Sequence, residues 1–188
     1  MPVKVLIDTN VWISAFLNPH GHPAKIVTAW LEDKIEVIIS LPLLREILDV
    51  LQRPRTQEKY KYSNEEIRNY LDLIFQRTNK IEPAGNVNLC RDRRDNIVLE
   101  TALSGQAKYL VTRDDDIKRD PNLIQAMSKS GIDVITVSRF LELFLAFSFE
   151  LHLLANKNIN DSFGGFAIPE LRNFTFLSLT VKDFEAFF

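Results

Sequence analysis

Two hydrophobic periods alternate along this chain, one typical of strands and one typical of helices. The first apolar run, residues 3–7, is nearly continuous, as in a strand that is buried on both faces. Apolar residues at helical spacing follow it, first Trp12 and Phe16 and then Ile26 and Trp30. This alternation predicts βαβ units, and therefore a parallel sheet with helices on its faces.

The same two periods predict the remaining elements. Further strands are expected over residues 36–40, 80–82, 108–112 and 133–137. Helices are expected to begin at Ser40 with Pro42, at the capping box of residues 63–66, at Asp95 and at Ser138. The result is an α/β fold with five parallel strands, contained in a domain of residues 1–146.

A second region of different composition follows this domain. Nine of the 13 phenylalanines lie between Phe147 and Phe188. Apolar surface contributes about 25 cal/mol per Å² when it is buried, so these side chains are expected to be covered. Residues 147–188 are therefore interpreted as an extension that packs on its own domain, forms a homodimer interface, or docks a partner protein.

Overall charge excludes two classes of protein. The 188 residues include 23 basic and 25 acidic ones, a net charge of −2, which fits neither a polybasic chain nor a long acidic disordered one.

The single cysteine, Cys90, excludes a disulfide framework and fits a reducing compartment. No apolar run reaches the roughly 18 residues of a membrane span, and no signal peptide is recognisable. A cytoplasmic location is expected.

Four acidic residues occupy positions where an α/β sheet carries functional groups. Asp8 ends the first strand and Asp114 follows the fourth, so both would project into one crevice if these strands are neighbours. Glu46 lies beside the apolar stripe of the third helix, and Asp95 opens the helix whose inward positions include Val98. The four are candidate catalytic residues.

Carboxylates that are packed together repel one another unless one is protonated or a cation lies between them. Mg²⁺ or Mn²⁺ with oxygen ligands is the natural solution, and such an ion can activate water for phosphodiester hydrolysis. Each acid also has a plain structural interpretation. Asp8 and Asp95 could be helix N-caps, Glu46 a solvated side chain, and Asp114 part of an ordinary turn.

Four motifs occur in a fixed order: Ile-Asp-Thr-Asn-Val from Ile7, Ser-x-x-Leu-Leu-x-Glu-Ile from Ser40, Arg-Asp-x-x-Asp-Asn from Arg91, and Val-Thr-x-Asp-x-Asp from Val111. In this order and spacing they resemble the PIN-domain family (PilT N-terminus-like), in particular the prokaryotic VapC-like toxins of toxin–antitoxin systems. The resemblance covers residues 3–145, and the chain after about residue 146 departs from the family pattern.

The resemblance implies a three-layer α/β/α fold and a Mg²⁺- or Mn²⁺-dependent endoribonuclease that cuts single-stranded RNA. By position it implies metal ligands at Asp8, Asp95, Asp114 and Asp116, with Glu46 as a further catalytic acid. Supporting polar residues would be Thr9, Asn10 and Thr112. An antitoxin and a second copy of the chain are the implied protein partners, and no membrane is implied.

Basic residues beside these acids are candidates for RNA binding: Arg91, Arg93, Arg94 and Arg113. Arg53, Arg55, Lys59 and Lys61, with Tyr60 and Tyr62 between them, form a second basic segment that is either a phosphate-binding surface or a solvated face. Three other functions stay open: a housekeeping nuclease without an antitoxin, a PIN scaffold that binds without cutting, and a phosphatase with Asp8 as its nucleophile. The phosphatase is disfavoured because no aspartate follows Asp8 two residues on.

Overall fold

Five parallel strands form one sheet in the order β3-β2-β1-β4-β5. A computed structural model describes residues 2–90 and 92–144 of the chain. In these, the strands are β1 (Val3–Ile7), β2 (Ile35–Ser40), β3 (Asn79–Ile81), β4 (Tyr109–Val111) and β5 (Asp133–Ile135). The central strand β1 pairs on both sides, with Val5 opposite Val37 of β2 and Tyr109 of β4. The predicted α/β fold with five parallel strands is therefore confirmed.

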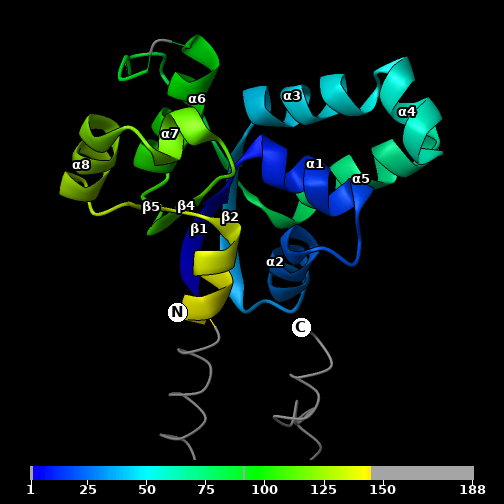
Figure 1. The fold of residues 1–188 in the computed structure, drawn as a ribbon, viewed down its shortest axis with the longest axis horizontal. Helices are drawn as coiled ribbons and strands as arrows, with labels where there is room; N and C mark the ends of the chain where they lie inside the picture. The colour runs from blue at the N-terminus through cyan, green and yellow to red at the C-terminus, as the bar shows by residue number, and fades with distance from the viewer. Residues whose placement is uncertain (1, 91, 145–188) are drawn as a thin grey trace, which may run out of the picture. The chain divides into compact units, whose positions relative to one another are not determined.

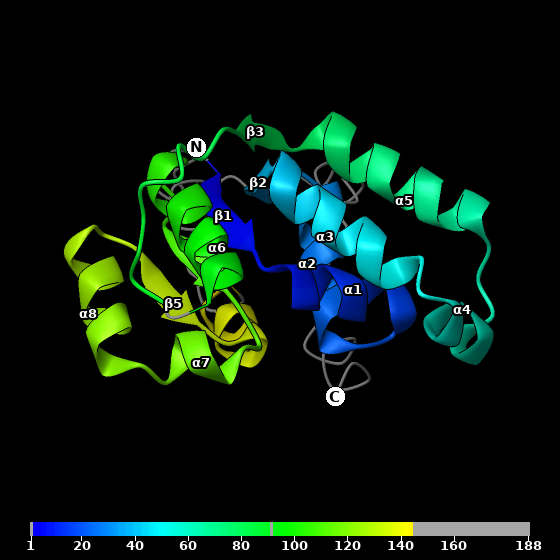
Figure 2. The same ribbon diagram turned by 90° about the horizontal axis from the view of Figure 1, so that it is seen from above.

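Helices cover both faces of this sheet. They are α1 (Thr9–Leu17), α2 (His22–Leu31), α3 (Leu41–Leu51), α4 (Pro54–Tyr60), α5 (Asn64–Arg77), α6 (Arg93–Ser104), α7 (Asp115–Lys118) and α8 (Pro121–Lys129), and residues 137–144 are also helical. The helices α1–α5 lie on one side of the sheet and α6–α8 on the other (Figures 1 and 2). The three layers agree with the predicted α/β/α architecture.

The strand order creates one reversal point, which lies between β1 and β4. The chain moves outward from β1 through β2 to β3, and then returns to the other side of β1 to form β4 and β5. The carboxyl ends of β1 and β4 therefore meet at the position where open α/β sheets bind their ligands. Asp8 follows β1 directly and Asp114 lies three residues after β4, so this topology brings the two acids to one edge.

The hydrophobic core occupies both interfaces between sheet and helices. The residues Leu6 and Ile7 of β1 and Leu110 of β4 are fully buried, as is expected for central parallel strands. On α6, Val98 and Ala102 turn inward as the sequence pattern predicts. Gly105 ends this helix, and a Cβ there would collide with Ile38 of β2. The glycine thus permits close packing of α6 against the sheet.

Several helix starts differ from those predicted. Asp92, rather than Asp95, caps α6, because its carboxylate accepts a hydrogen bond from the backbone N–H of Arg94. The last helix begins at residue 137, where the hydroxyl of Thr136, rather than that of Ser138, accepts from the N–H of Arg139. Ser40 precedes α3 as predicted, but its hydroxyl accepts a hydrogen bond from Thr101 instead of capping the helix.

The extension predicted over residues 147–188 lies outside the described residues, and so do its three interpretations. Residues 1–145 form one compact unit, which contains every element named above. None of the helices in the described part of the chain has the length and apolar character needed to span a membrane.

Candidate active site

Asp8 is a buried carboxylate that accepts hydrogen bonds from three side chains. It is 3% exposed, and its Oδ1 accepts from Thr9 Oγ1 at 3.3 Å. Its Oδ2 accepts from Asn10 Nδ2 at 2.7 Å and from the hydroxyl of Thr112. Asp8 occupies the N-cap position of α1, yet no side-chain cap hydrogen bond forms there. The interpretation of Asp8 as a plain helix cap is therefore wrong.

Thr112 joins the ends of the two central strands. Its hydroxyl donates to Asp8 and accepts from the backbone N–H of Asp114 at 2.9 Å. The neighbouring Arg113 is held in the same way, since its N–H donates to Asn10 Oδ1 at 3.3 Å and its guanidinium donates to Ser14 Oγ at 2.6 Å. The side chains of Asn10 and Thr112 thus fix the loop after β4 against the start of α1.

A pocket of about 200 Å³ opens at this edge of the sheet and brings the four predicted acids together. Its lining residues come from α1, α3, α6 and the ends of β1 and β4: Asp8, Thr9, Asn10, Ile13, Glu46, Val50, Arg94, Asp95, Val98 and Asp114. The carboxylates of Asp8, Glu46, Asp95 and Asp114 thus share one concave surface, although they are up to 106 positions apart in the sequence. We call this surface the acidic pocket.

Two of these acids hold their protons unusually well. Burial raises the pKa of Asp8, and the charge of Glu46 raises it further against the lowering effect of the Thr112 hydrogen bond. Burial together with the charges of Asp114, Asp92, Asp8 and Asp116 raises the pKa of Asp95 to about 6. Burial is the main cause of both shifts, and the neighbouring carboxylates add to them.

The remaining predicted ligand, Asp116, does not line the acidic pocket. It is an exposed residue of α7, and its backbone N–H donates to Asp114 Oδ1 at 2.8 Å, so that Asp114 caps this short helix. In the described part of the chain, no three His, Cys, Asp or Glu side chains lie close enough together to hold one metal ion as they stand. The acids line the pocket at separate positions and do not form a close group. Metal binding by Asp116 stays a prediction.

The predicted RNA-binding residues fall into different positions. Arg94 is exposed and lines the acidic pocket, whereas Arg113 is held against Ser14 beside it. Arg91 lies outside the described residues. Arg93 is the first residue of α6, and the structure does not describe its side chain.

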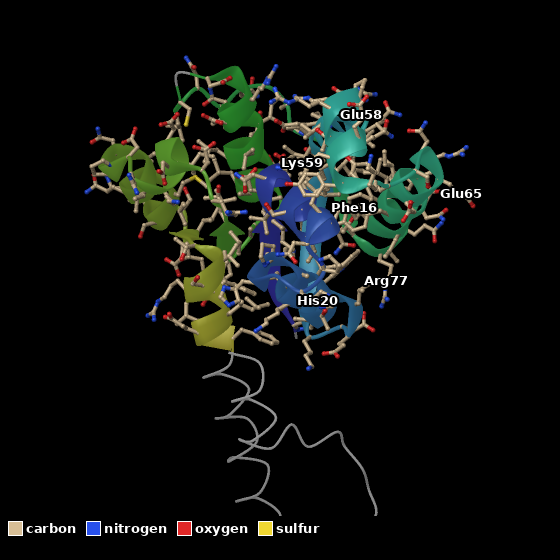
Figure 3. The ribbon with its side chains drawn as sticks, turned by 45° about the vertical axis from the view of Figure 1, so that its right-hand side comes forward. Phe16, His20, Glu58, Lys59, Glu65 and Arg77 are labelled. Atoms are coloured by element: carbon tan, nitrogen blue, oxygen red, sulfur yellow. The ribbon has the colours of Figure 1, made fainter. Side chains whose placement is uncertain are left out.

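The second basic segment offers less for base stacking than its sequence suggests. The hydroxyl of Tyr62 donates to the carbonyl of Leu51 at 2.8 Å, and its ring packs edge-on against Phe16 at 5.0 Å. Tyr60 is 43% exposed, with Lys59 Nζ 4.9 Å from its ring centre. Tyr62 thus has a structural role. In Figure 3, Phe16 and Lys59 are labelled, and His20 lies on the loop between α1 and α2.

Sequence patterns did not reveal two buried polar residues of α6. Asn96 is 6% exposed, and its Oδ1 accepts from the N–H groups of Leu89 and Cys90 while its Nδ2 donates to the carbonyls of Cys90 and Asp92. The carboxylate of Glu100 accepts from the N–H groups of residues 85 and 86. These side chains hold the loop before α6, and with it the start of the helix that carries Asp95. Asn96 is part of the Arg-Asp-x-x-Asp-Asn motif, which was the available signal.

Comparison with known proteins identifies the family. The family model of the PIN domain matches residues 4–116, which include all the motifs at the acidic pocket. The chain belongs to the PIN-domain family. An uncharacterised protein of Methanocaldococcus jannaschii is 35% identical over 147 residues, which cover 77% of this chain and 94% of that protein.

The fold is also similar to a chain in the crystal structure of VapBC2 from Rickettsia felis bound to a DNA fragment from its promoter. The match has a TM-score of 0.47 and 19% sequence identity, and it covers 71% of this PIN protein and 98% of that chain. PIN domains are generally nucleases, and the acidic pocket of this one lies where the family motifs meet.

Proposed function

We propose that this PIN protein is a Mg²⁺- or Mn²⁺-dependent endoribonuclease that hydrolyses phosphodiester bonds of single-stranded RNA. The observation that carries the proposal is the acidic pocket, where four carboxylates from separate elements converge at the reversal point of the sheet. Structural roles alone would not require this convergence, because burial together with the neighbouring carboxylate charges raises the pKa of both Asp8 and Asp95 and so disfavours their charged forms.

The residues of the pocket fit a hard divalent cation. All four acids offer carboxylate oxygen, which Mg²⁺ and Mn²⁺ prefer, and the described part of the chain places no histidine or cysteine in the pocket lining. A cation there would offset the burial and the neighbouring negative charges that together raise the pKa of Asp95. Asp8, Asp95 and Asp114 would hold the ion. When bound, it would supply Lewis-acid polarisation of the phosphate and would lower the pKa of a water molecule.

The protein's own side chains would perform the other tasks. Thr9, Asn10 and Thr112 fix the Asp8 carboxylate in one orientation, so little reorganisation is needed when the substrate binds. Glu46 faces the same pocket from α3 and would accept the proton of the attacking water. Arg94 lines the pocket beside Asp95 and would bind a phosphate oxygen of the strand.

We further propose that this nuclease is the cytoplasmic toxin component of a toxin–antitoxin pair, inhibited by an antitoxin protein. The four motifs that resemble VapC-like toxins support this assignment. A homodimer is the expected assembly. If a neighbouring reading frame encodes a small protein that copurifies with this chain and suppresses its activity, the chain is a toxin and not a housekeeping nuclease.

The test of the nuclease activity is incubation of the purified protein with structured and unstructured RNA, with Mn²⁺ or with EDTA. We expect internal cuts in the unstructured RNA that require Mn²⁺ and disappear in Asp8→Asn, while the circular dichroism spectrum of the variant is unchanged. Cleavage that persists in EDTA or in Asp8→Asn would refute the proposal. A wild-type protein that binds RNA but never cuts it would favour the scaffold function.

A further inference from the structure

A second cavity adjoins the acidic pocket, and its charge is opposite. It measures about 300 Å³ and lies between α3 and α6, which are neighbours at the carboxyl edge of the sheet (Figures 1 and 2). Its charged lining residues are Arg45, Glu46, Asp49, Arg53 and Arg94, and we call it the arginine pocket. Glu46, Val50 and Arg94 line both cavities, so the two are adjacent.

The three arginines are available to a ligand. Arg45, Arg53 and Arg94 are all exposed, and none of their guanidinium groups makes an ion pair with another residue that the structure describes. Three cations against the two carboxylates of Glu46 and Asp49 leave the arginine pocket net positive. The acidic pocket holds four carboxylates and only the one cation of Arg94 among its lining residues. A charge gradient therefore runs from one cavity to the other.

We infer that the arginine pocket binds a phosphate of the substrate strand that flanks the scissile phosphate. This inference rests on the proposed function and assigns a substrate contact to Arg45 and Arg53. A polyanion that enters the acidic pocket meets repulsion there, and an adjacent cluster of unpaired guanidinium groups offsets it. Guanidinium groups bind phosphate oxygens in a bidentate manner, and the three arginines that line this cavity are all exposed.

The spacing of Arg45, Asp49 and Arg53 indicates a regular row of side chains rather than a chance cluster. These residues recur every four positions, so they lie on one face of α3 and continue to the residue that precedes α4. Glu46 and Val50 lie beside this row and reach the acidic pocket. The helix α3 thus carries the proposed proton acceptor Glu46 and Arg45 in a fixed relation, and Arg53 follows two residues after this helix ends.

The experiment measures the binding of a fluorescent single-stranded RNA decamer. All proteins carry Asp8→Asn, which keeps the strand intact. The variant Arg45→Gln/Arg53→Gln is compared with Arg68→Gln/Lys129→Gln, which removes two exposed positive charges from α5 and α8, outside both pockets. Decamers in which one phosphate is a neutral methylphosphonate are then scanned position by position.

We expect the arginine variant to bind the decamer about tenfold more weakly than its parent, a loss of about 1.4 kcal/mol. The slope of log affinity against log salt should become shallower by about 0.7 for each phosphate that the variant no longer neutralises. Methylphosphonate at one flanking position should weaken binding by the parent and have no effect on the arginine variant. The matched variant should behave as the parent does.

Equal affinities of the parent and the arginine variant would overturn the inference, as would an equal loss in the matched variant. If the arginine variant loses affinity for a decameric polyglutamate peptide but not for RNA, the pocket belongs to an acidic protein partner and the inference is wrong. Cleavage by the protein with Asp8 intact is measured separately. Its absence would refute the proposed nuclease without changing the binding result, so the two failures are distinguishable.

Discussion

Replacing Asp95 by asparagine should stabilise the metal-free protein at pH 8 and leave its stability unchanged at pH 4. Burial and the charges of Asp114, Asp92 and other acids raise the pKa of Asp95 to about 6. The folded protein therefore holds this proton more tightly than the unfolded chain does. Wild-type stability accordingly falls as the pH rises from about 4 to about 6, because the folded state must give up a proton that it prefers.

The magnitude follows from the pKa of Asp95. A rise from 3.8 to about 6 corresponds to about 3 kcal/mol at 1.36 kcal/mol per unit. Asp95 is partly exposed, so solvent screening reduces this value. Asparagine also forgoes the attraction of about 0.3–1 kcal/mol between a carboxylate and the N-terminus of a helix, here that of α6. We expect a net gain of about 1 kcal/mol at pH 8.

Urea unfolding in EDTA, followed by circular dichroism, measures this gain at pH 4 and at pH 8. The control is Asp72→Asn, which removes an exposed acid of α5 that does not line the acidic pocket. The free energy of unfolding should differ between Asp95→Asn and wild type at pH 8 only. A difference that is the same at both pH values, or a less stable Asp95→Asn at pH 8, would show that the pKa of Asp95 is not raised as described.

Three further predictions concern the surroundings of the acidic pocket. Asn96→Ala should destabilise the protein by about 2–4 kcal/mol in urea unfolding, because it leaves the N–H groups of the loop before α6 unpaired. A loss of stability below about 0.5 kcal/mol would contradict the role assigned to this amide. Replacing Arg91, Arg93 and Arg94 together by alanine should weaken RNA binding and flatten its salt dependence, whereas an unchanged slope would identify a solvated face. Deleting residues 147–188 should change the oligomeric state or the solubility, as measured by light scattering, and an unchanged oligomer with an unchanged melting temperature would refute the expected burial of the phenylalanines.

Periodicity alone predicted the architecture because the strands β1, β2 and β4 are short, mostly apolar runs between helices, whereas the edge strand β3 is mostly polar. The bounds of β1 agree with the prediction, and the capping box at Ser63 and Glu66 forms as its spacing indicates. The helix α4 was not predicted, because it buries no residue and therefore has no apolar stripe. The short helix α8 was not predicted either, because it buries only Leu123 and Met127, which are too few positions to establish a helical period.

For the acids, the sequence predicted candidates but not their relation in space. Asp8 and Asp114 meet because β1 and β4 are neighbours, and this pairing depends on the whole topology. The hydrogen bonds of Asn96 and the adjacency of the two pockets depend on tertiary packing in the same way. Local pattern also misassigned the cap of α6, since Asp92 and Asp95 are equally suitable residues for that position.

The most direct test of the central claim is the single-turnover rate of RNA cleavage with Mn²⁺ in a set of acid-to-amide variants. Asp8→Asn, Asp95→Asn and Asp114→Asn should each cut at least about 100-fold more slowly than wild type, because each removes charge that the reaction needs at one site. Asp72→Asn should cut at the wild-type rate. Wild-type rates in Asp95→Asn and Asp114→Asn, or an equal loss in Asp72→Asn, would contradict the assignment of the acidic pocket as the active site.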